Sequence, residues 1–207
     1  GYGNAIHHVL RHVAETAQAT GKVPDAETLA SLIDEEFYLP FANKPAFERM
    51  YQAANRRVDR YVGEYSSDLE RVWATERPFE LHLDDGVVMG RADIILDREN
   101  GVDGSLVIVD YKLANDPIRD ERYRLQLAIY TAAARGEGLT VEGAYLHELG
   151  DGSRNTVDIS QDTVGDAVAA VNTSLAGIRQ GDYPARPETK KCQHCDFKQI
   201  CRHVTGT

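Results

Sequence analysis

The sequence of 207 residues lacks any long hydrophobic run and has more acidic than basic residues. No apolar stretch approaches the roughly 20 residues that span a bilayer, and the start of the chain has neither the basic region nor the apolar segment of a signal peptide. We therefore expect a cytoplasmic protein with no membrane partner. Lysine and arginine number 23 against 33 aspartate and glutamate, so the net charge is −10. This charge argues against non-specific coating of nucleic acid, because phosphates are bound by basic surfaces.

Cysteine is also scarce, and its position is informative. Cys192, Cys195 and Cys201 all lie in the last sixteen residues, with C-x2-C-x5-C spacing. This clustering favours a metal site over a disulfide framework, because a C-x-x-C turn brings two thiolates to one zinc ion or iron–sulfur centre. Three ligands are one too few. A zinc site could be completed by His194 or His203, whereas an iron–sulfur cluster needs a fourth cysteine that this chain does not contain.

The hydrophobic fraction of 42% is enough for one domain of ordinary size, which we divide into three parts. Residues 1–68 form an N-terminal helical part, residues 69–150 a part containing strands and one helix, and residues 151–207 a C-terminal helix and cysteine tail. Apolar periodicity predicts helices over 4–19, 25–36, 45–65, 120–134 and 161–179. Strands are predicted over 70–83, 87–96, 105–112 and 141–149, with turns at 84–86, 100–104 and 150–156.

The stretch from Val87 to Lys112 has the most informative charges. Asp93 lies in one predicted strand, while Asp110 and Lys112 end the next. Alternate residues of a strand point to the same face, so Asp110 and Lys112 share a face and Tyr111 points away. An ion pair at a strand end is the simplest interpretation, because charges are rarely buried without a partner.

Three other groups of polar residues surround this stretch in the sequence. Glu76, on the preceding strand, could bring a third carboxylate near Asp93. On the helix that follows, Gln126 shares a face with Tyr123 and Tyr130, which is a common packing arrangement as well as a source of hydrogen bonds. The predicted helix over 45–65 carries a basic patch of Arg56, Arg57 and Arg60, for which a solvated face is favoured over a phosphate-binding one.

The first predicted helix carries three histidines. Its apolar residues recur at helical spacing, at Ile6, Val9, Leu10, Val13 and Ala17. His8 and His12 are one turn apart, whereas His7 faces a different direction. Two histidines at this spacing can bind metal, although they more often form a solvated face.

Four short motifs occur in order along almost the whole chain: GNAIH at 3–7, GRAD at 90–93, DYK at 110–112, and Gln126 followed by Tyr130. They resemble the G-x-x-x-H, G-R-x-D, D-Y-K and Q-x-x-x-Y motifs of the RecB-like and Cas4-like branch of the PD-(D/E)XK nuclease superfamily. The resemblance implies an α/β fold with a central mixed β-sheet flanked by helices, followed by the cysteine-containing tail. It also implies an enzyme that hydrolyses DNA phosphodiester bonds.

The resemblance assigns roles to the motif residues. His7, Asp93, Asp110 and the backbone carbonyl of Tyr111 would bind a divalent metal, Lys112 would orient or help to deprotonate the attacking water, Gln126 and Tyr130 would position the scissile strand, and Glu76 resembles a carboxylate often found before the G-R-x-D strand. Oxygen ligands suit Mg²⁺ or Mn²⁺, and the imidazole favours Mn²⁺ somewhat. Such a metal neutralises developing charge and acidifies a bound water.

The cysteines resemble the last three of four that hold a [4Fe–4S] cluster in the AddB, Cas4 and Dna2 type of nuclease. The first of the four usually precedes the G-x-x-x-H helix, so we expect the fourth cysteine upstream of this chain and a less ordered or metal-free tail here. Because the sequence begins at the first of these motifs, we further expect an exonuclease module of a helicase–nuclease in DNA repair or recombination, with single-stranded DNA and a helicase domain as partners. A stand-alone Cas4-like exonuclease and a catalytically inactive DNA-binding or scaffold domain are the alternatives.

Overall fold

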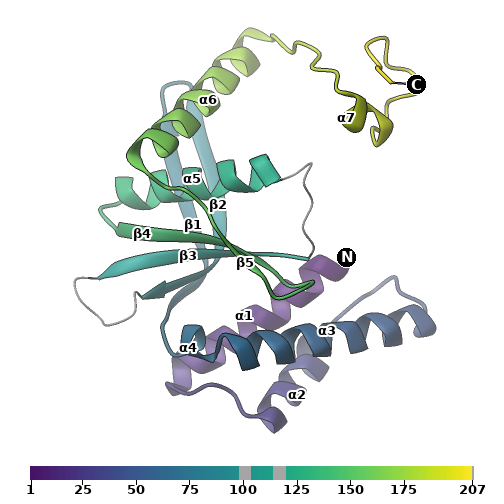
Figure 1. Ribbon diagram of the computed structural model, residues 1–207, viewed down its shortest axis with the longest axis vertical. Helices are drawn as coiled ribbons and strands as arrows, with labels where there is room; N and C mark the ends of the chain where they lie inside the picture. Colours follow the sequence, from purple (N-terminus) through teal and green to yellow (C-terminus); the bar gives the residue numbers. More distant parts are fainter. Residues whose placement is uncertain (98–103, 114–119, 207) are drawn as a thin grey trace.

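Helices and strands follow one another in the predicted order in the computed structural model (Figure 1), which describes residues 1–97, 104–113 and 120–206. The helices are α1 (Tyr2–Thr20), α2 (Ala26–Glu36), α3 (Lys44–Glu64), α4 (Ser66–Leu69), α5 (Asp120–Gly136), α6 (Gln161–Gln180) and α7 (Thr189–Gln193). The strands are β1 (Val72–Leu83), β2 (Gly86–Asp97), β3 (Ser105–Lys112), β4 (Thr140–Glu148) and β5 (Arg154–Thr156). The ends of every predicted helix and strand are correct to within two residues, but the short α4, α7 and β5 were not predicted.

The strands form one mixed sheet in the order β1-β2-β3-β4-β5. β1, β2 and β3 form an antiparallel meander, and β4 joins β3 in parallel because α5 crosses between them. The prediction of a turn over 150–156 is wrong in its second half, because residues 154–156 pair with the free edge of β4. The predicted turn at 100–104 lies, up to residue 103, outside the described residues, as does most of the loop after Leu113.

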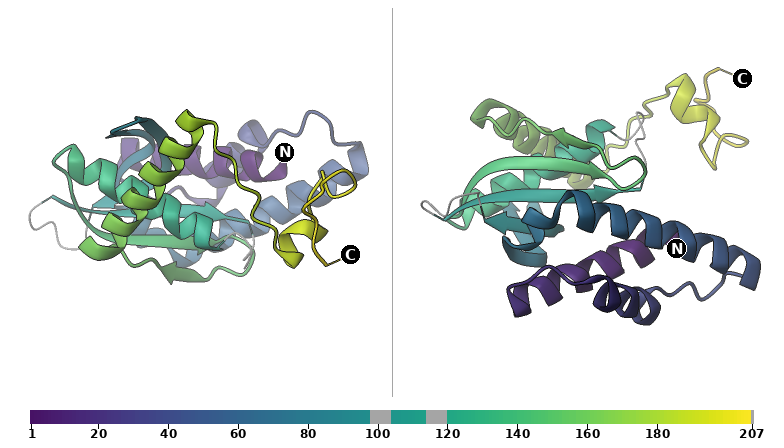
Figure 2. Two further views of the ribbon diagram at one scale, coloured as in Figure 1. Left: turned by 90° about the horizontal axis from the view of Figure 1, so that it is seen from above. Right: turned by 60° about the horizontal axis from the view of Figure 1, so that its bottom comes forward.

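Helices cover both faces of the sheet (Figure 2), which confirms the predicted α/β architecture. α1, α2 and α3 pack on one face, and their buried core includes Val109 and Tyr111 of β3. α5 and α6 pack on the other face, where the core includes Leu106 and Ile108 of the same strand. Alternate residues of β3 therefore serve different layers, as expected for a strand buried on both sides.

The local sequence explains where the helices begin and end. Asp25 caps α2 by accepting a hydrogen bond from the Thr28 backbone N at 2.9 Å. Gly21 ends α1 in the left-handed conformation at φ 66°, which glycine adopts without steric penalty. All five apolar residues predicted to face inward on the first helix are buried: Ile6, Val9, Leu10, Val13 and Ala17. This stripe fixes the direction in which each histidine of α1 points.

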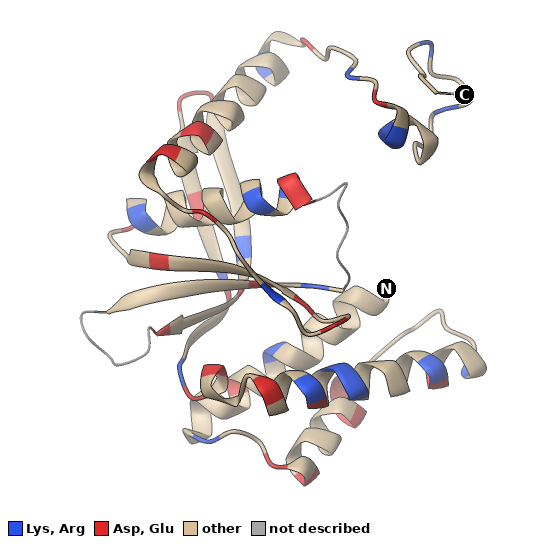
Figure 3. Ribbon diagram, viewed as in Figure 1, with Lys and Arg blue, Asp and Glu red and all other residues tan. Residues whose placement is uncertain are grey.

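The basic patch lies on α3, along which Figure 3 shows several separate blue segments of lysine or arginine among red ones. Two of its arginines are used inside the protein. Arg57 donates to the Tyr2 hydroxyl, and Arg60 donates to the Leu149 carbonyl at 2.6 Å. Arg56 is exposed. The patch therefore serves partly to attach α3 to α1 and to the loop after β4.

The segment after α6 differs from the rest of the chain. No residue from 181 to 206 is buried, and α7 extends away from the sheet and its helical layers (Figure 1). Phe197 and Ile200 are 69% and 83% exposed, so even the apolar residues of this tail have no core to join. Within the described residues, no helix is long and apolar enough to cross a membrane.

Candidate active site

The two aspartates meet where β2 and β3 stop pairing. The last pair of the ladder is Ile94 opposite Val109, which places Asp93 and Asp110 opposite each other one position further along. There the Tyr111 backbone N donates to the Asp93 Oδ2 at 2.7 Å, in place of the next ladder bond. A side chain thus satisfies a backbone donor that the diverging strands leave free, and this hydrogen bond fixes the direction of Asp93.

His7 reaches the same point from the other layer. Its Nδ1 lies 3.3 Å from Asp93 Oδ1, and its ring meets the Tyr111 ring edge-on with centroids 5.9 Å apart. Burial lowers the pKa of His7, but the hydrogen bond to Asp93 and the charges of Asp93 and Asp110 together outweigh burial and raise it. Spacing alone drew attention to His8 and His12 on this helix, whereas the structure brings His7 to the aspartates.

The glycine of the GNAIH motif allows α1 to approach the end of β3. A Cβ atom added to Gly3 would lie 3.3 Å from the Leu113 Cδ1, so there is little room for a side chain between the helix and the residue that follows DYK. Gly3 precedes His7 by one helical turn and faces the same way. A glycine at this position therefore lets the helix bring His7 close to the sheet.

Asp110 and Lys112 form an ion pair on the face of β3 that α5 covers. The predicted alternation is correct, because the Tyr111 side chain points to the opposite face and its hydroxyl donates to that of Tyr61 at 2.7 Å. Asp110 is only 2% exposed. Burial and the negative charge of Asp93 raise the pKa of Asp110 to about 6, against the opposing effects of Lys112 and His7. The carboxylates of Asp110 and Asp93 would strongly stabilise a cation bound between them.

α5 adds a chain of hydrogen bonds that leads from Lys112 back to β2. The Lys112 Nζ donates to the Gln126 Oε1 at 3.4 Å and lies 4.2 Å from the centre of the Tyr123 ring. The Gln126 Nε2 donates to the Tyr130 hydroxyl at 2.7 Å, and that hydroxyl also accepts from the Arg91 backbone N at 3.2 Å. The predicted Tyr and Gln stripe of this helix therefore faces the DYK strand and orients the lysine.

The glycine of the GRAD motif makes room for Tyr130. A Cβ atom added to Gly90 would lie 2.2 Å from Cε1 of the Tyr130 ring. Non-bonded carbon atoms do not come this close, so the ring or the strand would have to shift. The ring also packs against Phe79 of β1, with centroids 6.1 Å apart. The second motif glycine, like the first, is thus explained by close approach of a neighbouring element.

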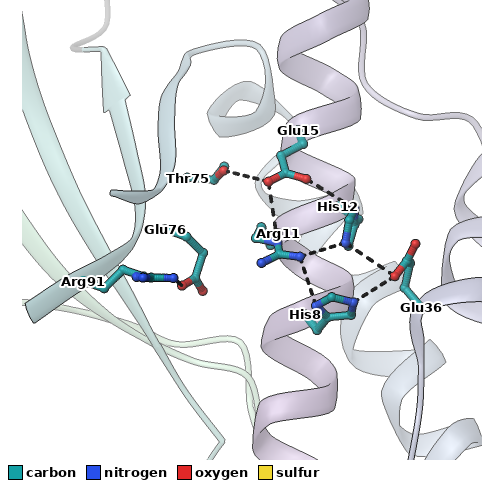
Figure 4. Close-up of polar contacts among 8 residues, drawn as sticks. All are labelled: His8, Arg11, His12, Glu15, Glu36, Thr75, Glu76 and Arg91. Atoms are coloured by element: carbon teal, nitrogen blue, oxygen red, sulfur yellow. Dashed lines mark hydrogen bonds and ion pairs between the residues drawn. The ribbon is translucent and has the colours of Figure 1, made fainter. Parts of the chain in front are cut away.

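Glu76 does not join Asp93 and Asp110 in this structure. By the register of β1 and β2 it lies opposite Asp93, but its backbone has a φ of 47° and its side chain pairs with Arg91 at 3.7 Å (Figure 4). A glutamate in the left-handed region costs about 1–3 kcal/mol, and such strain gathers at functional sites. The third carboxylate predicted near Asp93 is therefore next to it in the sheet but engaged with an arginine.

Sequence reasoning overlooked Glu148. This residue ends β4 opposite Lys112 in the parallel register and is only 4% exposed. Its Oε2 is buried and makes no hydrogen bond. Burial and the charge of Asp151 raise the pKa of Glu148, while Lys112 lowers it. The available signal was a carboxylate at the end of an apolar strand that follows α5, since parallel strands end at the same edge of a sheet.

The residues at this edge fit a divalent cation. Two carboxylates and one imidazole are a donor set for Mg²⁺ or Mn²⁺, and Asp110 Oδ2 is buried with Lys112 as its charged partner. The ligand atoms of His7, Asp93 and Asp110 do not all lie within 4.8 Å of one another. Asp110 is instead drawn to Lys112, so a bound cation would require Asp110 to turn partly away from the lysine.

The cysteines lie apart from this site. Cys192, Cys195 and Cys201 are all partly exposed in the tail, with Cys195 N donating to the Cys192 carbonyl at 3.3 Å in the predicted C-x-x-C turn. Their sulfur atoms do not all lie within 4.8 Å of one another. Zinc–sulfur distances of about 2.3 Å place thiolates about 3.8 Å apart in a tetrahedral site. In the described part of this tail, the three cysteines are therefore not arranged to bind one zinc ion.

Comparison with known proteins agrees with the fold. The chain belongs to the PD-(D/E)XK nuclease superfamily, whose family model matches residues 1–202. It is similar to a crystal structure from Eubacterium rectale of a protein provisionally named an exonuclease, with a TM-score of 0.50 and 13% identity over 97% of this chain and 76% of that one. The crystal structure of SSO0001 is similar with a TM-score of 0.39 and 16% identity, over 79% of this chain and 77% of that one. No curated protein matches.

These findings confirm the superfamily and the mixed α/β fold, and they support nuclease activity on nucleic acid. Members of this superfamily generally use divalent metal ions, which agrees with the donor set at the end of β3. The RecB-like and Cas4-like branch, the helicase association and the cluster stay predictions.

Proposed function

We propose that this chain is a Mg²⁺- or Mn²⁺-dependent deoxyribonuclease whose catalytic centre is the end of β3. The observation that carries the proposal is that His7 contacts Asp93 and Lys112 contacts Asp110 at one edge of the sheet, although α1, β2 and β3 supply them from different parts of the chain. A lone ion pair would need no histidine from the opposite layer. Two carboxylates, an imidazole and a lysine gathered at one sheet edge suit metal-assisted hydrolysis of a phosphodiester.

Each residue has a chemical task in this proposal. Asp93, Asp110 and His7 would hold the metal, with the Tyr111 carbonyl, and the metal would supply charge neutralisation and an acidified water. Lys112 faces Asp110, Gln126 and the Tyr123 ring, so its ammonium is held where it can orient that water or contact a phosphate oxygen. Gln126 and Tyr130 fix the lysine and position the scissile strand. Glu76 is a candidate further carboxylate on release from Arg91.

The narrower proposal is that residues 1–207 form a single nuclease domain that acts as the exonuclease module of a helicase–nuclease in DNA repair or recombination. Single-stranded DNA is the expected substrate and a helicase domain the expected partner. The net charge of −10 supports dependence on a partner. An acidic domain binds DNA weakly and with strong salt sensitivity, because affinity scales with the number of phosphates that are neutralised.

The decisive experiment measures digestion of end-labelled single-stranded and double-stranded DNA with Mg²⁺, with Mn²⁺ and with chelator. We expect metal-dependent cleavage that falls by at least about 10²-fold in Asp110→Asn and in Lys112→Ala, because each removes a charge from the reaction centre. Asp166→Asn and Lys22→Ala are matched controls, since both residues are exposed and lie on α6 and after α1. Undiminished cleavage in the two site variants would show that the reaction occurs elsewhere.

We also propose that Cys192, Cys195 and Cys201 bind a [4Fe–4S] cluster together with a cysteine outside this chain. The absence of a core around residues 181–206 supports the idea that this tail needs a cofactor to become ordered. Iron content and visible absorbance of anaerobically purified protein, with and without further N-terminal sequence, test this. Zinc in place of iron, or a longer chain that binds no iron, would contradict the cluster.

A further inference from the structure

The face of α1 that lies toward α2 carries a second histidine–carboxylate cluster. His8 and His12 lie one turn apart on α1, and Glu36, the last residue of α2, reaches them from the neighbouring helix (Figure 4). The two imidazole rings meet edge-on with centroids 4.6 Å apart. All three side chains are partly exposed, with 41%, 27% and 28% of His8, His12 and Glu36 accessible, so an ion from solvent has access to them.

The distances match the requirements of a single small cation. Glu36 Oε2 lies 2.8 Å from His8 Nε2 and 3.4 Å from His12 Nε2. Among the described residues, these three are the one group of histidine, cysteine or acidic side chains whose ligand atoms all lie within 4.8 Å of one another. Tetrahedral zinc, with ligands at about 2.0–2.2 Å, places those ligands about 3.3 Å apart. The pocket therefore needs only small side-chain movements to accept an ion.

A second layer of contacts orients one of the imidazoles. The Nδ1 of His12 lies 3.3 Å from Glu15 Oε2, and the hydroxyl of Thr75 on β1 donates to Glu15 Oε1 at 3.3 Å. A carboxylate that accepts from one ring nitrogen fixes the tautomer and leaves the other nitrogen, here Nε2, as a metal ligand. A solvated surface pair has no need of this arrangement. The sheet thus helps to aim His12 at Glu36.

We propose that His8, His12 and Glu36 bind Zn²⁺, with water as the fourth ligand, and that this ion joins α1 to the end of α2. Two imidazoles and one carboxylate suit zinc better than Mg²⁺, because imidazole is a ligand of the borderline metals. The site is separate from the candidate active site, which uses His7 on another face of the helix. It does not depend on the proposed nuclease function.

Arg11 is the competitor of the ion. One of its Nη atoms lies 3.2 Å from His8 Nδ1 and 3.0 Å from His12 Nε2, so the guanidinium contacts an atom that zinc would need. Arg11 also lies 3.5 Å from Glu15, which gives it another partner when it leaves. The cluster therefore has two alternative occupants, the arginine and the metal. Zinc binding requires the guanidinium to move toward Glu15.

The test is zinc binding to the full chain in a background that removes the three cysteines and Asp110. In Cys192→Ser/Cys195→Ser/Cys201→Ser/Asp110→Asn protein, isothermal titration with ZnCl₂ should give one site, and Co²⁺ should give the visible absorption of four-coordinate cobalt. His12→Gln and Glu36→Gln should each weaken zinc binding by at least about tenfold. Arg11→Gln should strengthen it by about fivefold or more, because it removes a competing positive charge.

Two substitutions serve as matched controls. His82 pairs with Glu80 at 3.6 Å on exposed β1 without a third ligand, and Glu35 is exposed beside Glu36. His82→Gln and Glu35→Gln should leave zinc binding unchanged. Absence of a zinc site in the background protein, equal affinity in His12→Gln and Glu36→Gln, or no gain in Arg11→Gln would each overturn the proposal. Circular dichroism checks folding, and Arg11→Gln keeps all three ligands if a ligand variant fails to fold.

Discussion

Two faces of α1 carry the same kinds of side chain and do different things with them. His7 faces the sheet and meets Asp93, where the buried carboxylate of Asp110 on the neighbouring strand and a lysine complete the group. His8 and His12 face α2 and meet Glu36 in a partly exposed setting, beside an arginine. The difference teaches that residue type does not define a site. Burial and the neighbouring charges decide whether a histidine and a carboxylate can serve chemistry or only attachment.

The group around His7, on the inner face of α1, is assembled from distant parts of the chain. The group around His8 and His12, on the outer face of α1, comes mostly from one helix. Asp93 and Asp110 come together one position beyond the Ile94–Val109 pair, where β2 and β3 stop pairing. His8 and His12 come together through helical spacing alone, and only Glu36 is added by packing of α2. Substitutions on the two faces should therefore have effects of different kinds and sizes.

The largest effect is expected for His7→Ala. Removing the imidazole that contacts Asp93 should lower metal-dependent DNA cleavage by about 10²–10³-fold, as for loss of other preorganised groups at a reaction centre. The measurement is the initial rate on end-labelled DNA at saturating Mn²⁺. His82→Ala, at an exposed position of β1, is the matched control. If the two variants cleave equally well, the inner face of α1 has no catalytic role and the comparison fails.

A somewhat smaller effect is expected for Gly90→Ala. The added methyl group would lie 2.2 Å from the Tyr130 ring, so the ring must move and release the Gln126 amide. Misplacement of about 1 Å at a catalytic site lowers rates by up to about 10²-fold. The control is Gly165→Ala at an exposed position of α6, where an added Cβ atom would meet nothing within 4 Å. A full rate in Gly90→Ala would show that Tyr130 does not position the site.

The pKa of His147 reports how well water is excluded from the region beside Tyr111. Burial, with the charges of Arg154 and Arg60, lowers the pKa of His147 from 6.5 to about 3. The folded state keeps this histidine neutral while the unfolded state is protonated below 6.5, so stability is lost as the pH falls. Between pH 6.5 and about pH 5 the free energy of unfolding should drop by about 2 kcal/mol from this group.

The check is denaturant unfolding at both pH values for the native chain and for His147→Phe. Phenylalanine keeps the edge-on packing against Tyr61 and Tyr65 but has no proton to bind. It should remove this part of the acid sensitivity, whereas His82→Gln on the surface should not. An identical pH dependence in the native chain and His147→Phe would mean that the pKa of His147 is not depressed.

The smallest effect is expected for Thr75→Val, which concerns the outer face. The valine preserves shape and strand propensity but cannot donate to Glu15, so His12 is aimed less firmly. Zinc affinity in the background protein defined above should fall by less than about tenfold, because Thr75 acts through two intermediates. Thr140→Val at the exposed start of β4 is the control. A loss as large as that in His12→Gln would mean that Thr75 supports the helix itself.

The sequence by itself determined the secondary structure and much of the fold. Apolar periodicity and the caps at Asp25 and Gly21 set the helices to within two residues, because these signals are local. Alternation along β3 placed Asp110 and Lys112 on one face and Tyr111 on the other, as found. The motif resemblance identified the superfamily, which the family comparison confirms. Residues 154–156 were misassigned because their pairing partner lies in another strand.

Only the tertiary structure decided which charged groups meet. The contact of His7 with Asp93, the position of Glu148 opposite Lys112, and the pairing of Glu76 with Arg91 all depend on register and layer packing, which no local pattern encodes. The same holds for the motif glycines Gly3 and Gly90. They make room for the Leu113 side chain and the Tyr130 ring, which approach from elsewhere in the chain. Spacing proposed His8 and His12 as a pair, but α2 had to supply Glu36 before three ligands faced one point.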